Sequence, residues 1–139
     1  MLNAKSVLLV EDDNIDAMTV KRSLNDLGAK VSLARSTNGE EALAYLRDPN
    51  NEIPSIILLD LNMPKMNGME FLKVVKNDEK LRQIPVIVFT TSKEEYDVLK
   101  SFEMSIAGYI IKSFDYQQFL ESMRMLHSYW NLSLLPQNV

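Results

Sequence analysis

Short apolar runs alternate with longer segments of helical periodicity along the chain. The runs VLLV, IILL and VIVF are apolar at successive positions, which is typical of strands covered on both faces of a sheet. In chain order the segments are SVLLV, NIDAMTVKRSLNDLG, KVSLAR, EEALAYLR, SIILL, GMEFLKVVK, PVIVF, EEYDVLKSF, AGYII and DYQQFLESMRMLHSYW. Five strands alternating with five helices predict an α/β fold, a doubly wound parallel sheet with right-handed helical crossovers.

The ends and faces of the helical segments agree with this prediction. Asn14 is expected to cap the first helix, and Gly28 is expected to close it in the left-handed conformation. Residues predicted to face the core recur at helical spacing. They are Ala17, Val20, Leu24 and Leu27 in the first helix, and Phe119, Met123, Leu126 and Trp130 in the last.

The composition indicates one domain, residues 1–139, in which 128–139 form the end of the last helix and an apolar tail. A net charge of -4 and a pI near 5.0 argue against nucleic-acid binding. Without cysteine there is no disulfide, thiolate metal site or cysteine nucleophile, and the only histidine is His127. No apolar run resembles a signal peptide or reaches the roughly 20 residues that span a bilayer, so a cytoplasmic protein is expected.

Polar residues stand just past four of the predicted strands. Glu11 and Asp12 follow the first strand, Asp60 ends the third, Thr90 ends the fourth and Lys112 follows the fifth. The carboxyl ends of parallel strands meet at one edge of the sheet, where open α/β sheets bind their ligands. We therefore expect these residues to form one site.

Three carboxylates at this edge would repel one another, each pair by roughly 3 kcal/mol at about 5 Å and an effective dielectric near 20. The cluster therefore needs a cation, and oxygen ligands without cysteine or histidine favour Mg²⁺. Lys112 and the Thr90 hydroxyl would bind a phosphoryl group. The reaction that fits these residues is attack of Asp60 on an activated phosphoryl group to give an aspartyl phosphate. Gly68 would allow the backbone to enter the next helix through a tight turn.

These motifs together resemble the receiver domain of two-component response regulators, over essentially the whole chain. The matching pieces are VLLVED, LLDLNMPKMNG, VIVFTTS and AGYIIK. The resemblance implies a flavodoxin-like five-stranded parallel sheet of order 2-1-3-4-5. The resemblance also implies that Asp60 is the phosphoacceptor. It implies that Mg²⁺ is bound directly by Asp60, Asp12 and the backbone carbonyl of Asn62, and through water by Glu11. Thr90 and Lys112 would bind the phosphoryl group, and Tyr109 would be the aromatic residue that rotates when Thr90 moves.

A narrower resemblance links NGEEALAYLR, LRQIPVIVFTTSKEE and SYWNLSLLP to single-domain regulators of cyanobacterial-type phytochrome kinases. It implies a histidine kinase or phosphotransfer protein as phosphodonor, and a protein contact rather than nucleic acid or membrane as the output. Trp130, Leu132, Leu134 and Leu135 are too apolar for a free end. They either fold back on the domain or form a homodimer, and the resemblance favours the dimer.

Two positions depart from the family pattern. The family usually has a cis-proline after the lysine, whereas Ser113 follows Lys112 here, so a trans bond is predicted. Ser105 stands where a glycine often follows the fourth helix. Neither change removes a side chain expected to contact the phosphoryl group. Apart from these positions, Asp13 and Asp16 are interpreted as solvated acids of the loop and of the first helical turn.

Three other functions share part of this pattern. A degenerate receiver would fold and bind partners without being phosphorylated. A phosphatase with an aspartate nucleophile would need a second acid two residues after Asp60, where Asn62 stands. A flavin mononucleotide carrier would not place three acids after the first strand. No enzyme activity is expected beyond self-phosphorylation from small donors and autodephosphorylation.

Overall fold

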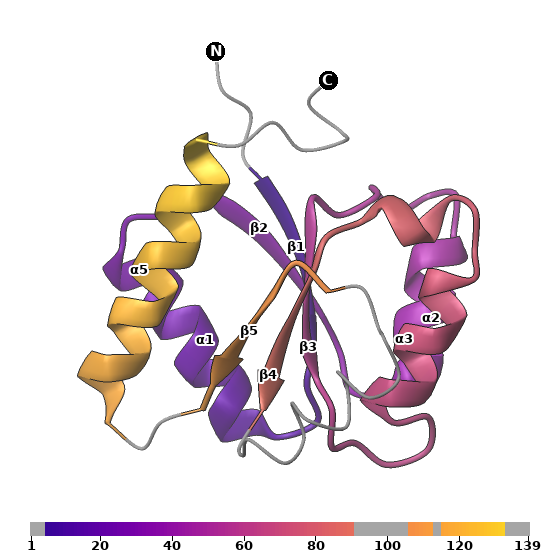
Figure 1. The fold of residues 1–139 in the computed structure, drawn as a ribbon, viewed down its shortest axis with the longest axis horizontal. Coiled ribbons are helices and arrows are strands. Elements are labelled where there is room, and N and C mark those ends of the chain that lie inside the picture. Colours follow the sequence, from indigo (N-terminus) through magenta and orange to yellow (C-terminus); the bar gives the residue numbers. More distant parts are fainter. Residues whose placement is uncertain (1–4, 91–105, 113–114, 133–139) are drawn as a thin grey trace.

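The computed structural model describes residues 5–90, 106–112 and 115–132, without the side chains of residues 90, 131 and 132. A five-stranded sheet occupies its centre (Figure 1). The strands are β1 (Lys5–Val10), β2 (Val31–Ser36), β3 (Ile56–Asp60), β4 (Val86–Thr90) and β5 (Gly108–Ile111). All neighbouring strands are parallel, and their order is β2-β1-β3-β4-β5, which confirms the predicted fold class and strand order.

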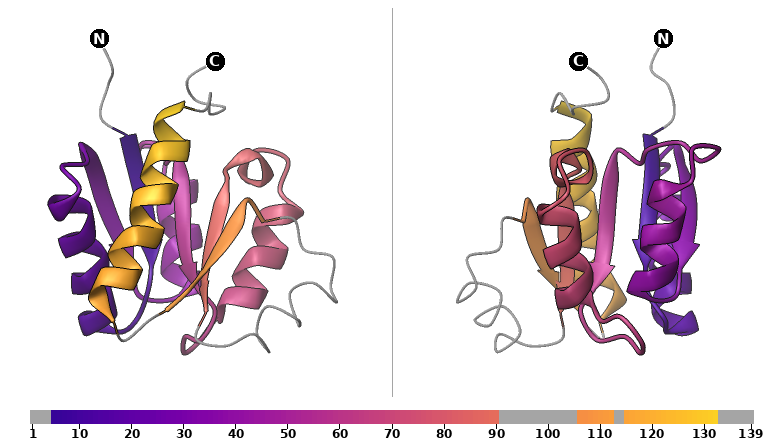
Figure 2. Two further views of the ribbon diagram at one scale, coloured as in Figure 1. Left: turned by 60° about the vertical axis from the view of Figure 1, so that its left-hand side comes forward. Right: turned by 90° about the vertical axis from the view of Figure 1, so that its right-hand side faces the viewer.

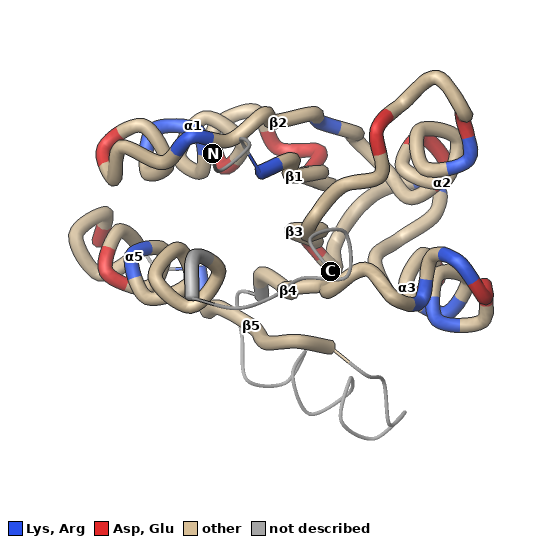
Figure 3. Tube along the Cα trace, turned by 90° about the horizontal axis from the view of Figure 1, so that it is seen from above, with Lys and Arg blue, Asp and Glu red and all other residues tan. Residues whose placement is uncertain are grey.

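Helices cover both faces of the sheet. They are α1 (Asn14–Asp26), α2 (Gly39–Arg47), α3 (Gly68–Lys76) and α5 (Tyr116–Leu132), with a short 3₁₀ turn, η1 (Leu81–Gln83), before β4. Seen from above in Figure 3, α1 and α5 lie on one side of the strands, and α2 and α3 lie on the other. The predicted fourth helix, EEYDVLKSF, and Ser105 lie outside the described residues.

The core is divided by the sheet into two apolar clusters. One packs β-strand residues such as Leu8 and Leu59 against Phe71 and Leu72 of α3. The other packs the opposite faces of the strands against α1 and α5. Every residue of β3 is buried, as expected for a strand covered on both sides. This burial fixes the central strand, and with it the position of the residue at its carboxyl end.

The first helix differs from the prediction at its start. Its N-cap is Asp13, whose carboxylate accepts a hydrogen bond from the backbone N–H of Asp16 at 2.9 Å, and Asn14 is the first helical residue. Aspartate and asparagine are about equally good caps, so the sequence alone did not decide between neighbours. Gly28 does adopt the left-handed conformation, with φ +66°. The predicted stripe is buried at its first three positions, and Leu27 packs at the edge of the cluster.

The last helix lies against the sheet beside α1 (Figure 2). Phe119, Met123 and Trp130 are buried, and Leu126 packs against their cluster, which confirms the predicted face. Trp130 therefore belongs to the core of its own chain. The side chain of Leu132 and residues 134 and 135 lie outside the described part. Within the described part, no helix has the length and apolar character required to cross a membrane.

Candidate functional site

The site forms where β1, β3 and β5 reach the carboxyl edge of the sheet. Val10 pairs with Leu59 across β1 and β3, so the next residues, Glu11 and Asp60, are neighbours at the edge. Lys112 directly follows β5, whose last residue, Ile111, pairs with Thr90. The register of the parallel strands therefore brings residues far apart in the sequence to one place.

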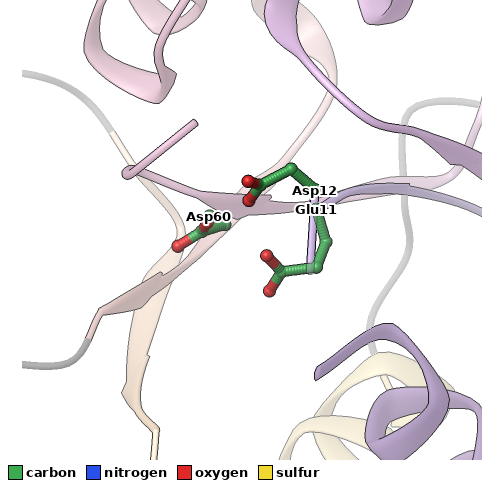
Figure 4. Close-up of side chains that lie close together, drawn as sticks. All are labelled: Glu11, Asp12 and Asp60. Atoms are coloured by element: carbon green, nitrogen blue, oxygen red, sulfur yellow. The ribbon is translucent and has the colours of Figure 1, made fainter. Parts of the chain in front are cut away.

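The three predicted acids converge as expected. One carboxylate oxygen from each of Glu11, Asp12 and Asp60 lies within 4.8 Å of the other two, and the three side chains are seen together in Figure 4. Glu11 and Asp60 are only 2% and 4% exposed, whereas Asp12 is exposed. The cluster thus has a buried base and one side open to solvent.

Lys112 provides the opposite charge. Its Nζ donates hydrogen bonds to Glu11 Oε1 at 2.9 Å, Asp16 Oδ2 at 2.9 Å and Asp60 Oδ1 at 3.2 Å. The bonds to Glu11 and Asp60 agree with the predicted convergence. The bond to Asp16 corrects the interpretation of that residue as a solvated acid. No local pattern indicates this contact, because an acid in the first turn of a helix is ordinarily a surface residue.

Burial and charge shift the protonation of the cluster. Burial raises the pKa of Glu11 from its ordinary value of 4.5 to about 7; the hydrogen bond from Lys112 opposes this shift, and the charge of Asp60 adds to it. Burial also raises the pKa of Asp60, against the charge of Lys112. Burial alone would lower the pKa of Lys112, but its hydrogen bonds to Asp16 and Glu11 outweigh burial, and the net shift is upward. Lys112 therefore remains an ammonium beside Asp60.

The loops around the acids are held by further contacts. Arg35, at the end of β2, donates from Nε to the carbonyl oxygen of Glu11 and from a terminal nitrogen to Asn14 Oδ1, both at 2.9 Å. Sequence reasoning missed this arginine, because nothing in the local pattern of β2 indicates its partner. Gly68 starts α3 so close to the site that a Cβ would lie 2.5 Å from the backbone oxygen of Asp60, which explains the glycine.

The other residues predicted for the site are Thr90, Tyr109 and Asn62, and the structure describes the side chains of only the last two. The backbone of Thr90 ends β4 at the same edge, but its side chain lies outside the described part. Tyr109 is half-buried in β5 and packs against the cluster on the α2 and α3 side. Asn62 is exposed, and its backbone N–H hydrogen-bonds to the Asp60 carboxylate. Ser113 is not described, so the bond after Lys112 remains a prediction.

The donor set suits a hard divalent cation. Carboxylate oxygens within 4.8 Å of one another, one of them open to solvent, match the oxygen ligands and retained waters that Mg²⁺ prefers. Lys112, which contacts two of the acids, places a positive charge beside the cluster.

Residues 7–124 match the family described as the response regulator receiver domain. Among similar proteins, the probable methanogenesis regulatory protein FilR2 of Methanothrix harundinacea (strain 6Ac) is 35% identical over 127 residues, covering 89% of this chain and 82% of that protein. The response regulator Rcp1 of Synechocystis sp. (strain ATCC 27184 / PCC 6803 / Kazusa) is 35% identical over 130 residues, covering 91% of this chain and 88% of Rcp1.

Two solved structures share the whole fold. The phosphorylated cyanobacterial phytochrome response regulator RcpA has a TM-score of 0.86 and 34% identity, over 96% of this chain and 99% of that chain. The Mn²⁺-bound form of Rcp1 has a TM-score of 0.84 and 35% identity, over 95% and 99% of the two chains. One of these similar proteins was thus crystallised in a phosphorylated form and the other with a divalent metal.

Proposed function

Because this chain belongs to the response regulator receiver domain family, a module of two-component signalling, we propose that Asp60 accepts a phosphoryl group from a histidine kinase in the cytoplasm. The observation that carries the proposal is the contact of Lys112 Nζ with Asp60 Oδ1, 3.2 Å, beside the clustered oxygens of Glu11 and Asp12. A buried carboxylate next to an ammonium is a nucleophile whose product has part of its negative charge balanced by that ammonium.

In the proposed reaction a carboxylate oxygen of Asp60 forms a bond to phosphorus. The bond from phosphorus to the donor breaks, and its electron pair leaves with the donor: the imidazole nitrogen of a phosphohistidine, or acetate from acetyl phosphate. Lys112 moves one N–H to a phosphoryl oxygen, and the Thr90 hydroxyl donates to another. The backbone N–H of Asn62 holds the Asp60 carboxylate in place.

Asp12, Asp60 and the backbone carbonyl of Asn62 would hold Mg²⁺ directly, and Glu11 would hold it through water. Bound there, the ion would neutralise the charge of the incoming phosphoryl group. The burial of Glu11 and Asp60 supports this assignment, because two buried carboxylates are stabilised by a nearby cation.

The output would follow from a change at β4 and β5. When Thr90 moves toward the phosphoryl group it vacates space, and Tyr109, half-buried in the neighbouring strand, turns into it. The turn of Tyr109 would change the shape of the β5 surface that partner proteins bind. The test is Thr90→Ala: phosphorylation should persist while phosphorylation-dependent partner binding is lost, and unchanged binding would contradict this route.

Exposed apolar side chains support two protein contacts. On α1, Ile15 and Met18 are 74% and 68% exposed, and Ile15 directly precedes Asp16; this surface is suited to docking of the kinase or a phosphotransfer protein. Separately, β5 and α5 line a groove of about 840 Å³ with Ile111, Met125 and Tyr129 at its surface. A homodimer through α5 and the residues after it would cover this groove.

Phosphorylation is tested with acetyl phosphate and Mg²⁺ and read by intact mass. The protein should gain the mass of one phosphoryl group, and Asp60→Asn should gain none. Absence of the adduct in the unchanged protein would favour a degenerate receiver. Release of many phosphate equivalents per chain would favour a phosphatase. Removal of Mg²⁺ with a chelator should abolish the adduct without unfolding the protein.

A further inference from the structure

All three N–H groups of the Lys112 ammonium donate hydrogen bonds to carboxylates. An ammonium has three N–H donors, and they meet oxygens of Glu11, Asp16 and Asp60 at 2.9, 2.9 and 3.2 Å. Glu11 and Asp60 belong to the acidic cluster with Asp12, whereas Asp16 is not a member of that cluster. Asp16 is therefore a lysine partner outside the set of oxygens proposed to hold the metal.

The side chain of Asp16 does not cap its own helix, α1. Asp13 caps α1 and accepts the hydrogen bond from the backbone N–H of Asp16. The Asp16 carboxylate, 42% exposed, turns instead toward Lys112, which is 96 positions away in the chain. Within the described part of the chain, this contact connects the first turn of α1 to the end of β5.

Phosphorylation would affect the three partners of Lys112 differently. The oxygen of Asp60 that bonds to phosphorus is no longer part of a free carboxylate, and Glu11 is committed to the water shell of the metal in the proposed reaction. Asp16 belongs neither to the phosphoacceptor nor to the acids proposed to hold the metal, so its contact with Lys112 is the one that the reaction would not consume. A lysine on its flexible four-carbon stem needs such a fixed contact, because otherwise its rotamers spread over many orientations.

We propose that Asp16 is a positioning residue for phosphoryl transfer, which holds the Lys112 ammonium at the mouth of the site and leaves one N–H free to pass from Asp60 to the phosphoryl group. The inference rests on the proposed function of Asp60. It assigns a role in the reaction to a residue that contacts neither the phosphoryl group nor the metal.

The first test is the rate of phosphorylation of Asp16→Asn by acetyl phosphate. Asparagine keeps an oxygen that can accept from Lys112 but removes the charge that holds the ammonium, so the rate should fall roughly three- to tenfold, the value of making a partly exposed charged hydrogen bond neutral. Loss of one negative charge near an anionic donor would by itself raise the rate, so the two explanations predict opposite signs. The matched control is Glu40→Gln, which removes an exposed first-turn acid of α2 and should not slow the reaction.

A double-mutant cycle shows whether Asp16 acts through Lys112. In a Lys112→Ala background, Asp16→Asn should cause no further loss, and Asp16→Glu in the unchanged background should restore part of the rate. An unchanged or faster rate in Asp16→Asn, or the same loss with and without Lys112, would overturn the proposal.

A second measurement needs no phosphodonor. The ¹⁵N resonance of the Lys112 ammonium should shift, and its proton exchange should quicken, in Asp16→Asn but not in Glu40→Gln. An ammonium signal that is identical in Asp16→Asn would overturn the positioning role even if Asp60 is phosphorylated. If instead the signal shifts while the unchanged protein takes up no phosphoryl group, the proposed function of Asp60 fails and the ion pair stands.

Discussion

Replacing Glu11 with glutamine should remove most of the pH dependence of stability from the metal-free protein between about pH 5 and about pH 8. Glu11 is 2% exposed, and its pKa is raised from 4.5 to about 7. The folded protein therefore binds this proton more tightly than the unfolded chain does. Its stabilising contribution is fully present below about pH 4.5 and is lost as the pH rises through about 7.

The pKa shift of Glu11 determines how much the free energy of unfolding changes with pH. At 1.36 kcal/mol per pKa unit, a rise from 4.5 to about 7 corresponds to about 3 kcal/mol, of which roughly 2–3 kcal/mol falls between pH 5 and pH 8. Asp60, whose pKa is also raised by burial, adds a contribution of the same sign. Glutamine imitates the protonated acid and keeps an oxygen that can accept from Lys112, so the variant should lose the slope without losing the fold.

The assay is urea unfolding at both pH values in the presence of a chelator, with unfolding free energies taken from the linear extrapolation. The unchanged protein should be less stable at the higher pH, and Glu11→Gln should be nearly as stable at both. Added Mg²⁺ should restore stability at the higher pH in the unchanged protein, because the cation replaces the proton. A slope of equal size in Glu11→Gln would refute the reasoning.

Three further changes test the framework around the site. Gly68→Ala should destabilise the protein by about 1–3 kcal/mol in urea unfolding, because the new Cβ would lie 2.5 Å from the Asp60 backbone oxygen; a neutral effect would mean that the loop yields freely. Trp130→Ala should cost about 3–5 kcal/mol by the same assay, since its side chain is 2% exposed, and a loss below about 1 kcal/mol would contradict its place in the core. Arg35→Ala should weaken Mg²⁺ binding in calorimetry roughly tenfold, because it frees the carbonyl of Glu11; unchanged affinity would show that the loop needs no such support.

Much of the site was predictable because it depends on strand ends. Strands apolar at every position had to be buried, and parallel strands place their carboxyl ends together. These two rules locate Glu11, Asp60 and Lys112 at one edge before any coordinates are known. The helix faces followed from the same logic, and Trp130 is buried at the position its spacing predicted.

The contacts that the sequence did not indicate are made by side chains across long separations. Asp16 reaches Lys112 over 96 positions, and Arg35 reaches the backbone of Glu11 from a neighbouring strand. Neither contact has a local pattern, since an exposed first-turn acid and a strand-end arginine are ordinary surface residues. Likewise, Asp13 and Asn14 are equally suited to cap α1, and only the path of the loop selects Asp13.

The sequence by itself predicted the layers and the gathering of polar residues at one edge of the sheet, because hydrophobic periodicity and the rules for parallel crossovers leave few arrangements open, while the strand order was implied by the resemblance to receiver domains. Only the tertiary structure decided which carboxylates share the lysine and how deeply each is buried. Those properties depend on side-chain directions and solvent exposure at the meeting of several elements, which no single segment specifies. The raised pKa of Glu11 and the ion pair of Asp16 both arise there.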